Sequence, residues 1–160
     1  MAIFGKRQGG EEAQQKRQAL IQSFEEQLHN QETILYGVAL FFECISTLLA
    51  DDPAVLETYR KQFRNIIQTG RDCSAKAAAL LDKAKSDSKA APMLEQFKIT
   101  SCDAHPSPEV MRQRAVALVA AYDEAFPGRD RTQPFSEDDI MLLMHTASET
   151  IALAPSAAAE

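Results

Sequence analysis

Apolar residues recur every three and then four positions through two long stretches of this chain, with almost no slip. The first repeat is held by Ile21, Phe24, Leu28, Gln31, Leu35, Val38, Phe42, Ile45 and Leu49. The second is held by Leu56, Tyr59, Phe63, Ile66, Gly70, Cys73, Ala77, Leu80 and Ala84. This spacing is typical of helices that pack along a coiled-coil-like seam. Because only residues 50–55 separate the two stretches, the sequence predicts a long antiparallel helical hairpin.

The first helix of this hairpin is expected at about 11–50, after a flexible tail at 1–10. A straight helix of about 40 residues is roughly 60 Å long at 1.5 Å per residue. A compact domain of this size is only about 40 Å across. The helix therefore either extends beyond a compact body or breaks, and the polar run 29–31 is where a break is expected. The sequence leaves both possibilities open.

The second helix is expected at about 53–86. Asp52 is a favourable N-cap residue, and Pro53 suits the first helical position because its missing N–H would have no partner there. The sequence therefore predicts that the hairpin turn ends at Asp52.

Antiparallel pairing about this turn defines which seam residues meet. It places Phe42 against Phe63. The same register places Leu35 near Gly70, a residue without a side chain that would let the two helices approach closely. The lower part of the seam therefore combines bulky residues on one helix with small residues on the other.

Three shorter helices are expected after the hairpin, at 92–100, 108–126 and 137–153. Ser136 and Asp139 form a short variant of the capping box at the start of the last one. The faces expected to point inward are Met93, Leu94 and Phe97; Met111, Ala115, Leu118, Val119, Tyr122 and Ala125; and Ile140, Leu143, Met144, Ala147 and Ile151. Together these elements predict an all-α, bundle-like fold.

The composition agrees with this fold class. Apolar residues make up 45% and charged residues 25% of the 160 residues, which is ordinary for a soluble protein with one core. We expect a single domain over 11–154, followed by a flexible tail at 155–160.

Residues 34–49 are apolar nearly all round the expected helix, so they need to be covered on every side. The second helix of the hairpin can cover only one side. The remainder requires the C-terminal helices or a second copy of the chain. We therefore consider six residues as candidates for an interface: Tyr36, Leu40, Phe41, Cys44, Thr47 and Leu48.

The charge distribution is uneven. The net charge of −6 argues against nucleic acid as the main partner, because binding phosphates requires an excess of Lys and Arg. Yet residues 53–89 carry eight Lys or Arg against four Asp or Glu, whereas residues 90–160 carry five against eleven. Either the basic helix faces the acidic C-terminal helices, or it presents a basic docking surface.

Cysteine usage and hydropathy indicate the compartment. Cys44, Cys73 and Cys102 form no CxxC pair and leave an odd count, so we expect reduced thiols and a cytoplasmic location. The first ten residues lack the apolar core of a signal peptide. Residues 34–50 are at the short limit for a membrane span, and Glu43 in their middle argues against one.

Few residues form patterns that carry chemistry. Three local groupings resemble parts of metal or catalytic sites: Glu26 with His29, His145 with Glu149, and Cys102 with Asp103 and His105. The Glu-x-x-His unit of Glu26 and His29 occurs once, whereas di-iron bundles use two such units. Its position in the apolar repeat places both side chains on the outward face of the helix. Glycine-rich phosphate loops and the common hydrolase and zinc motifs are absent. We therefore expect neither a metal nor a cofactor.

These observations favour a non-enzymatic protein–protein interaction module, such as an adaptor, scaffold or chaperone-like bundle. Its expected partners are a second copy of itself, another protein, or both, and neither nucleic acid nor a membrane. The alternative is a small-molecule- or metal-binding helical bundle, a class that includes enzymes. Its pocket would be lined by residues such as Phe41, Phe42, Tyr122, Met141 and Met144.

Overall fold

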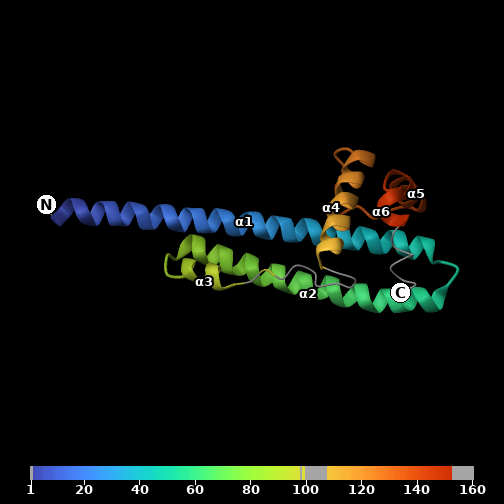
Figure 1. Cartoon of the computed structure of the whole chain (residues 1–160), viewed down its shortest axis with the longest axis horizontal. Coiled ribbons are helices and arrows are strands. Elements are labelled where there is room, and N and C mark those ends of the chain that lie inside the picture. The colour runs from blue at the N-terminus through green and yellow to red at the C-terminus, as the bar shows by residue number, and fades with distance from the viewer. Residues whose placement is uncertain (1, 98, 100–107, 153–160) are drawn as a thin grey trace. The chain divides into compact units, whose positions relative to one another are not determined.

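A computed structural model describes residues 2–97, 99 and 108–152 of the chain (Figure 1). Its elements are α1 (Ala2–Leu48), α2 (Pro53–Ser86), α3 (Ala91–Gln96), α4 (Pro108–Ala125), α5 (Glu137–Thr146) and α6 (Ser148–Ala152). No strand occurs within these described ranges. The all-α prediction is confirmed, including the long helix pair and the shorter helices that follow it.

The chain divides into two compact units, and both long helices contribute to each. The first unit comprises Met1–Gln31 and Asp72–Thr100, and the second comprises Glu32–Arg71 and Ser101–Glu160. Each unit has an apolar core of its own. The single domain expected over 11–154 stays a prediction, and the tail expected at 155–160 lies outside the described residues.

Helix α1 is longer than its sequence pattern indicated. It begins at Ala2, so residues 2–10, which we expected as a tail before the helix, form its first turns. It also continues through residues 29–31 without a break. Sharp kinks usually need a proline, and the segment from Ala2 to Leu48 contains none. Once a helix is nucleated, each added residue gains a hydrogen bond, so polar residues alone do not end it.

The turn between the long helices is built as predicted. Asp52 caps α2, since its side-chain Oδ1 accepts a hydrogen bond of 3.3 Å from the backbone N–H of Val55. The Asp52 carbonyl accepts the first helical bond, from Leu56, at 3.0 Å. The local sequence is therefore sufficient to start α2 at Pro53.

In the first unit, bulky residues of α1 pack against small residues of α2 and α3. Its buried core consists of Phe24, Leu28, Ala77, Leu81, Ala84, Ala90, Ala91 and Leu94. Helix α3 ends earlier than the expected residue 100 because Phe97 adopts an extended conformation. From that position the Phe97 ring contacts Phe24 edge-on, with centroids 6.0 Å apart. Tertiary packing of one aromatic ring thus sets the end of α3.

Polar contacts also hold the end of α2 to α1 in the first unit. The Arg17 guanidinium donates to the carbonyls of Ala84 at 2.8 Å and Lys85 at 2.9 Å. These carbonyls lie in the last turn of α2, where intrahelical partners run out. The Lys85 ammonium forms an ion pair with Glu25. Arg17 therefore acts as a C-terminal cap supplied by the neighbouring helix.

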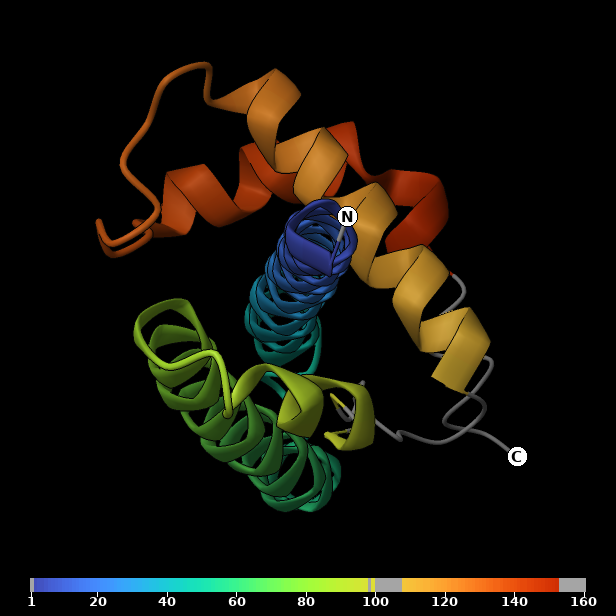
Figure 2. The same ribbon diagram turned by 90° about the vertical axis from the view of Figure 1, so that its left-hand side faces the viewer.

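In the second unit, α1 lies between α2 on one side and α4, α5 and α6 on the other (Figures 1 and 2). On the α2 side the rings of Phe42 and Phe63 pack with centroids 5.4 Å apart, which confirms the predicted register. On the other side Tyr36 contacts Tyr122 edge-on at 5.5 Å. The C-terminal helices therefore cover the apolar side of α1 that α2 leaves open.

The crossing of α1 and α4 depends on Gly37, which the sequence did not single out. A Cβ atom on Gly37 would lie 2.6 Å from the carbonyl carbon and 2.7 Å from the Cα of Ala115. Backbone atoms cannot move aside as the end of a side chain can. Only glycine at this position lets the two helix backbones come so close.

Gly70 also faces a close neighbour, but of a softer kind. A Cβ atom there would lie 3.2 Å from Cγ of Leu35 and closer still to its Cδ2. This confirms the predicted pairing of Leu35 with Gly70. The obstacle is a side-chain end, so a rotamer change can relieve part of the clash.

Arg129 fixes the connection from α4 to α5. Its guanidinium lies 4.8 Å from the ring centroids of both Phe126 and Phe135. It also donates to the Pro134 carbonyl at 2.8 Å and pairs with Asp139 at 2.9 Å. One planar cation thus joins the end of α4 to the start of α5.

The predicted capping box starts α5. The backbone N–H of Asp139 donates to Ser136 Oγ, and the Ser136 N–H donates to the Asp139 carboxylate. This second bond, together with the Arg129 guanidinium, holds the pKa of Asp139 below its usual value.

The helix expected over 137–153 is interrupted, which corrects the sequence prediction. It ends at Thr146, and Ala147 at φ −107° and ψ 24° separates it from α6. The Thr146 hydroxyl donates to the Leu142 carbonyl at 2.9 Å, a contact that tends to bend helices. Ala147 at this bend and Ile151 in α6 are both buried. Core packing therefore overrides the helical pattern here.

Replacing Gly37 with Ala is expected to destabilise the protein. Alanine favours helix by about 1 kcal/mol over glycine, but the clash with the Ala115 backbone should cost more, leaving a net loss of about 2 kcal/mol. Thermal and urea unfolding followed by circular dichroism measure this. Gly10→Ala is the control, because a Cβ there meets no atom within 4 Å, and it should cause no loss. Wild-type stability in Gly37→Ala would contradict the crossing.

Replacing Arg129 with Lys is expected to lower the melting temperature. Lysine cannot contact two rings and two oxygens at once, and the lost ring contacts alone are worth about 1 kcal/mol. Arg60→Lys serves as the matched control, since Arg60 is exposed and makes only a surface pair with Glu57. Equal melting temperatures for the two variants would show that Arg129 does not anchor the connection.

Candidate functional site

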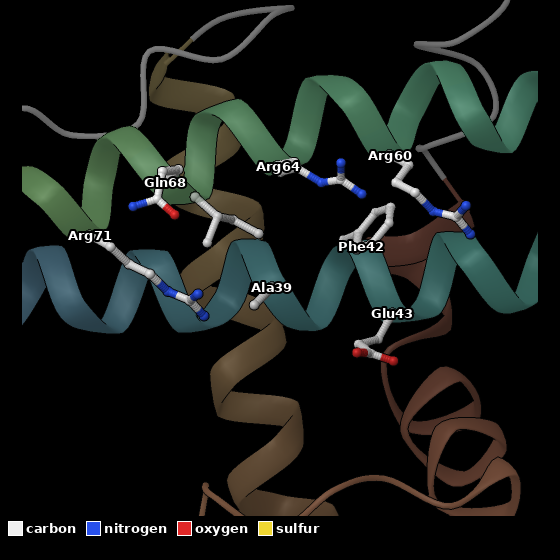
Figure 3. A pocket seen from close by; sticks show the side chains of 8 residues that line it. Ala39, Phe42, Glu43, Arg60, Arg64, Gln68 and Arg71 are labelled. Carbon is white, nitrogen blue, oxygen red and sulfur yellow. The ribbon is translucent and has the colours of Figure 1, made fainter.

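A basic groove lies between α1 and α2 in the second unit, with a volume of about 350 Å³ (Figure 3). Five residues of α2 line it, and three of them are arginines. Its lining consists of Ala39, Phe42, Glu43, Arg60, Arg64, Ile67, Gln68 and Arg71.

The arginines form one stripe because of their spacing. Arg60 and Arg64 are four residues apart and Arg71 follows seven later, so all three lie on the same side of α2, next to the seam. All three are exposed. Arg60 pairs with Glu57 at 3.1 Å. Arg64 and Arg71 make no ion pair within the described residues, so their charges are available to a ligand.

The floor of the groove is apolar, and its far rim carries one carboxylate. Phe42 and Ile67 pack against the core beneath, and each keeps part of its surface exposed. Glu43 extends from α1 at the rim (Figure 3). Three guanidinium groups thus stand against one carboxylate, and the groove carries a net positive charge.

This combination suits a particular kind of ligand. Guanidinium groups bind carboxylates and phosphates through two parallel hydrogen bonds. An aromatic and aliphatic floor binds apolar side chains. The groove is therefore suited to a surface on which acidic groups flank apolar ones.

The structure places the six interface candidates differently from one another. Leu40 is 2% exposed, Phe41 4% and Cys44 0%, and all three belong to the core of the second unit. Tyr36 is half-buried against Tyr122. Phe41 packs against Phe63 of α2 with ring centroids 6.0 Å apart, and Tyr36 packs against Tyr122 of α4, so other helices of the same chain cover these two residues.

The last two candidates lie at the end of α1. Thr47 is half-buried, and its hydroxyl donates to the Glu43 carbonyl at 3.1 Å. Leu48 is 46% exposed. An interface with a second copy stays a prediction, but the apolar surplus that motivated it is largely used within one chain.

The candidate list from the sequence missed the whole groove. The available signal was the excess of Lys and Arg in residues 53–89, one of whose two interpretations was a basic docking surface. The other interpretation had these charges facing the acidic C-terminal helices. In the second unit α1 lies between them (Figure 2), and the C-terminal ion pairs Arg129–Asp139 and Arg131–Asp123 are internal to that region.

Metal and membrane sites are not apparent in the part of the chain that the structure describes. No three His, Cys, Asp or Glu side chains there come together as metal ligands. Glu26, His29, His145 and Glu149 are all exposed. No helix of the described ranges is both long and apolar enough to cross a bilayer. The grouping of Cys102, Asp103 and His105 lies outside the described residues.

Cys44 is a core residue and not a reactive thiol. Burial raises the pKa of its thiol to about 12, and the neighbouring Glu43 carboxylate adds to the shift. Only the thiolate is a nucleophile, so Cys44 stays protonated and unreactive at neutral pH. Cys73 is half-buried.

Comparison with known protein families, curated proteins and solved structures finds no match to this chain.

We expect the Cys44 thiol to be protected in the folded protein. In a variant with Cys73→Ser and Cys102→Ser, a thiol reagent at pH 8 should react only after denaturant is added, because burial excludes both reagent and charge. Absorbance of the released chromophore measures the rate. Rapid labelling of the native variant would show that the core around α1 opens readily.

Proposed function

We propose that this chain is a protein–protein interaction module, which binds an acidic amphipathic segment of its partner in the groove between α1 and α2. The proposal concerns binding alone and assigns no catalytic step. It selects one of the two roles that the uneven charge distribution suggested, namely a basic docking surface on α2.

One observation carries the proposal: Arg64 and Arg71, with no ion pair in the described chain, flank an apolar floor of Phe42 and Ile67. Exposed arginines with no partner carry out no evident structural task, whereas arginine and aromatic residues are enriched at interface hot spots. An amphipathic helix laid in such a groove would satisfy both its charged rim and its apolar floor.

The groove suits a small anionic ligand, which is the alternative occupant, less well than it suits an amphipathic helix. Its volume of about 350 Å³ is at the lower end for ligand pockets. Its lining residues follow one another along the two helices, and its three arginines and Glu43 are exposed, whereas small-molecule sites enclose most of the ligand. A small anion thus becomes an outcome that the binding experiment can reveal.

The experiment uses a fluorescent helical peptide of about four turns, with Glu at positions i and i+4 beside a stripe of Leu. We expect it to bind the full chain and a scrambled peptide of the same composition to bind at least tenfold less, because the scrambled apolar residues cannot lie on one face. Fluorescence anisotropy measures both affinities. Equal binding of the two peptides would contradict an amphipathic ligand.

Variants locate the binding surface. Arg64→Glu should weaken peptide binding about tenfold or more, because it replaces attraction with repulsion at the rim. The control is Lys61→Glu, which makes the same charge change on an exposed residue of α2 that does not line the groove. If both variants weaken binding equally, the effect is non-specific electrostatics and the groove is not the site. Binding of inorganic phosphate with displacement of the peptide would favour the small-anion alternative.

A further inference from the structure

The outward face of α5 combines exposed apolar and acidic side chains. Met141 is 55% exposed and Leu142 is 46% exposed, although both are large apolar residues. Asp138 and His145 are also exposed, and the spacing of three, four and seven residues puts all four on one face. The inward residues Ile140 and Leu143 are buried, so the face is set by the packing of α5 on α4 and α6.

The carboxylates at this face have no partner within the described residues. Asp139 is engaged with Arg129 and Ser136, whereas Glu137, Asp138 and Glu149 are exposed and make no ion pair there. The outer face of α5, here Asp138, Met141, Leu142 and His145 with these flanking carboxylates, is therefore an apolar patch bordered by negative charge.

This face matches the groove in chemistry. The groove offers Arg60, Arg64 and Arg71 around an apolar floor, and α5 offers unpaired carboxylates around Met141 and Leu142. Arg64 and Arg71 make no ion pair within the described residues, and neither do the carboxylates beside Met141 and Leu142, so each surface leaves exposed the groups that the other can cover.

The two surfaces also match in length. The arginine stripe spans twelve residues of α2, or about 18 Å, and the ten residues of α5 measure about 15 Å at 1.5 Å per residue. Within one chain α1 lies between α2 and the C-terminal helices of the second unit, so α5 does not occupy the groove of its own chain (Figures 1 and 2).

We propose that the groove between α1 and α2 receives the outer face of α5 from a second copy of this chain. The inference rests on the proposed function, since it identifies the acidic amphipathic segment as one that the protein carries itself. The two surfaces differ, so the contact is head-to-tail: each copy presents one groove and one α5, and association continues until a ring closes or a short filament forms. The contact is small, and the assembly is in exchange with monomer.

Sedimentation velocity over a range of concentrations tests this. The wild-type chain should sediment faster as its concentration rises, and added salt should reverse the effect because it screens the charges. Arg64→Glu and Asp138→Lys should each weaken self-association about tenfold or more, through repulsion at opposite sides of one contact. Lys61→Glu is the control and should associate as wild type does.

Mixing the two variants gives the decisive result. The Arg64→Glu chain keeps a native α5 and the Asp138→Lys chain keeps a native groove, so an equimolar mixture should regain association that neither variant shows alone. The double variant should regain it as well, because the two charges are exchanged. If the single variants associate normally, or if neither the mixture nor the double variant recovers, the proposal is overturned.

Two further measurements separate folding and functional effects. Met141→Ser replaces an exposed apolar side chain with a small polar one and leaves the Ser136–Asp139 cap intact. It should therefore weaken association even if Asp138→Lys proves unstable by circular dichroism. A wild-type chain that stays monomeric but still binds the acidic helical peptide in its groove would overturn the α5 contact alone. Failure of both would also overturn the proposed function.

Discussion

The second unit depends on a stretch of α1 that is apolar nearly all round and so requires cover from more than one neighbour. One neighbour cannot provide it: Phe63 of α2 packs on Phe42, and Tyr122 of α4 packs on Tyr36. The apolar residues between these contacts, such as Val38 and Cys44, are thereby removed from water completely. Cover on both sides is possible only because Gly37 lets the backbone of α4 approach that of α1. A methyl group at that one position would separate the helices and reopen the core.

Covering α1 in this way has a consequence for the surface. The C-terminal helices pack on one side of α1 and α2 on the other, and Arg64 and Arg71 of the arginine stripe make no ion pair within the described residues. This packing also turns the polar and apolar outer face of α5 toward solvent. The groove and this face thus arise from the same packing arrangement, and the charges that they expose are opposite in sign.

Local sequence signals predicted the elements well where short-range chemistry decides. Asp52 with Pro53 starts α2, and Ser136 with Asp139 starts α5, because an N-cap needs only a few neighbouring residues. The same signals failed where packing decides. Phe97 ends α3 early by turning toward Phe24, and Ala147 interrupts the last helix to keep both of its halves against the core. The groove was missed because its residues come from two helices, and a charge excess along one helix does not show what lies opposite.

By itself, the sequence determined the fold class, the register of the hairpin and the start of its second helix. An apolar repeat of three and four residues indicates an α-helix, and two such helices joined by one short turn can pair in only one register. Only the tertiary structure decided which neighbour covers the surplus apolar face of α1, and hence which side chains remain exposed. Hydrophobic stabilisation depends on the apolar area that is buried and not on which chain buries it. Helices of the same chain and a second copy would therefore stabilise this face equally. The choice was made by the close approach at Gly37, which no periodicity encodes.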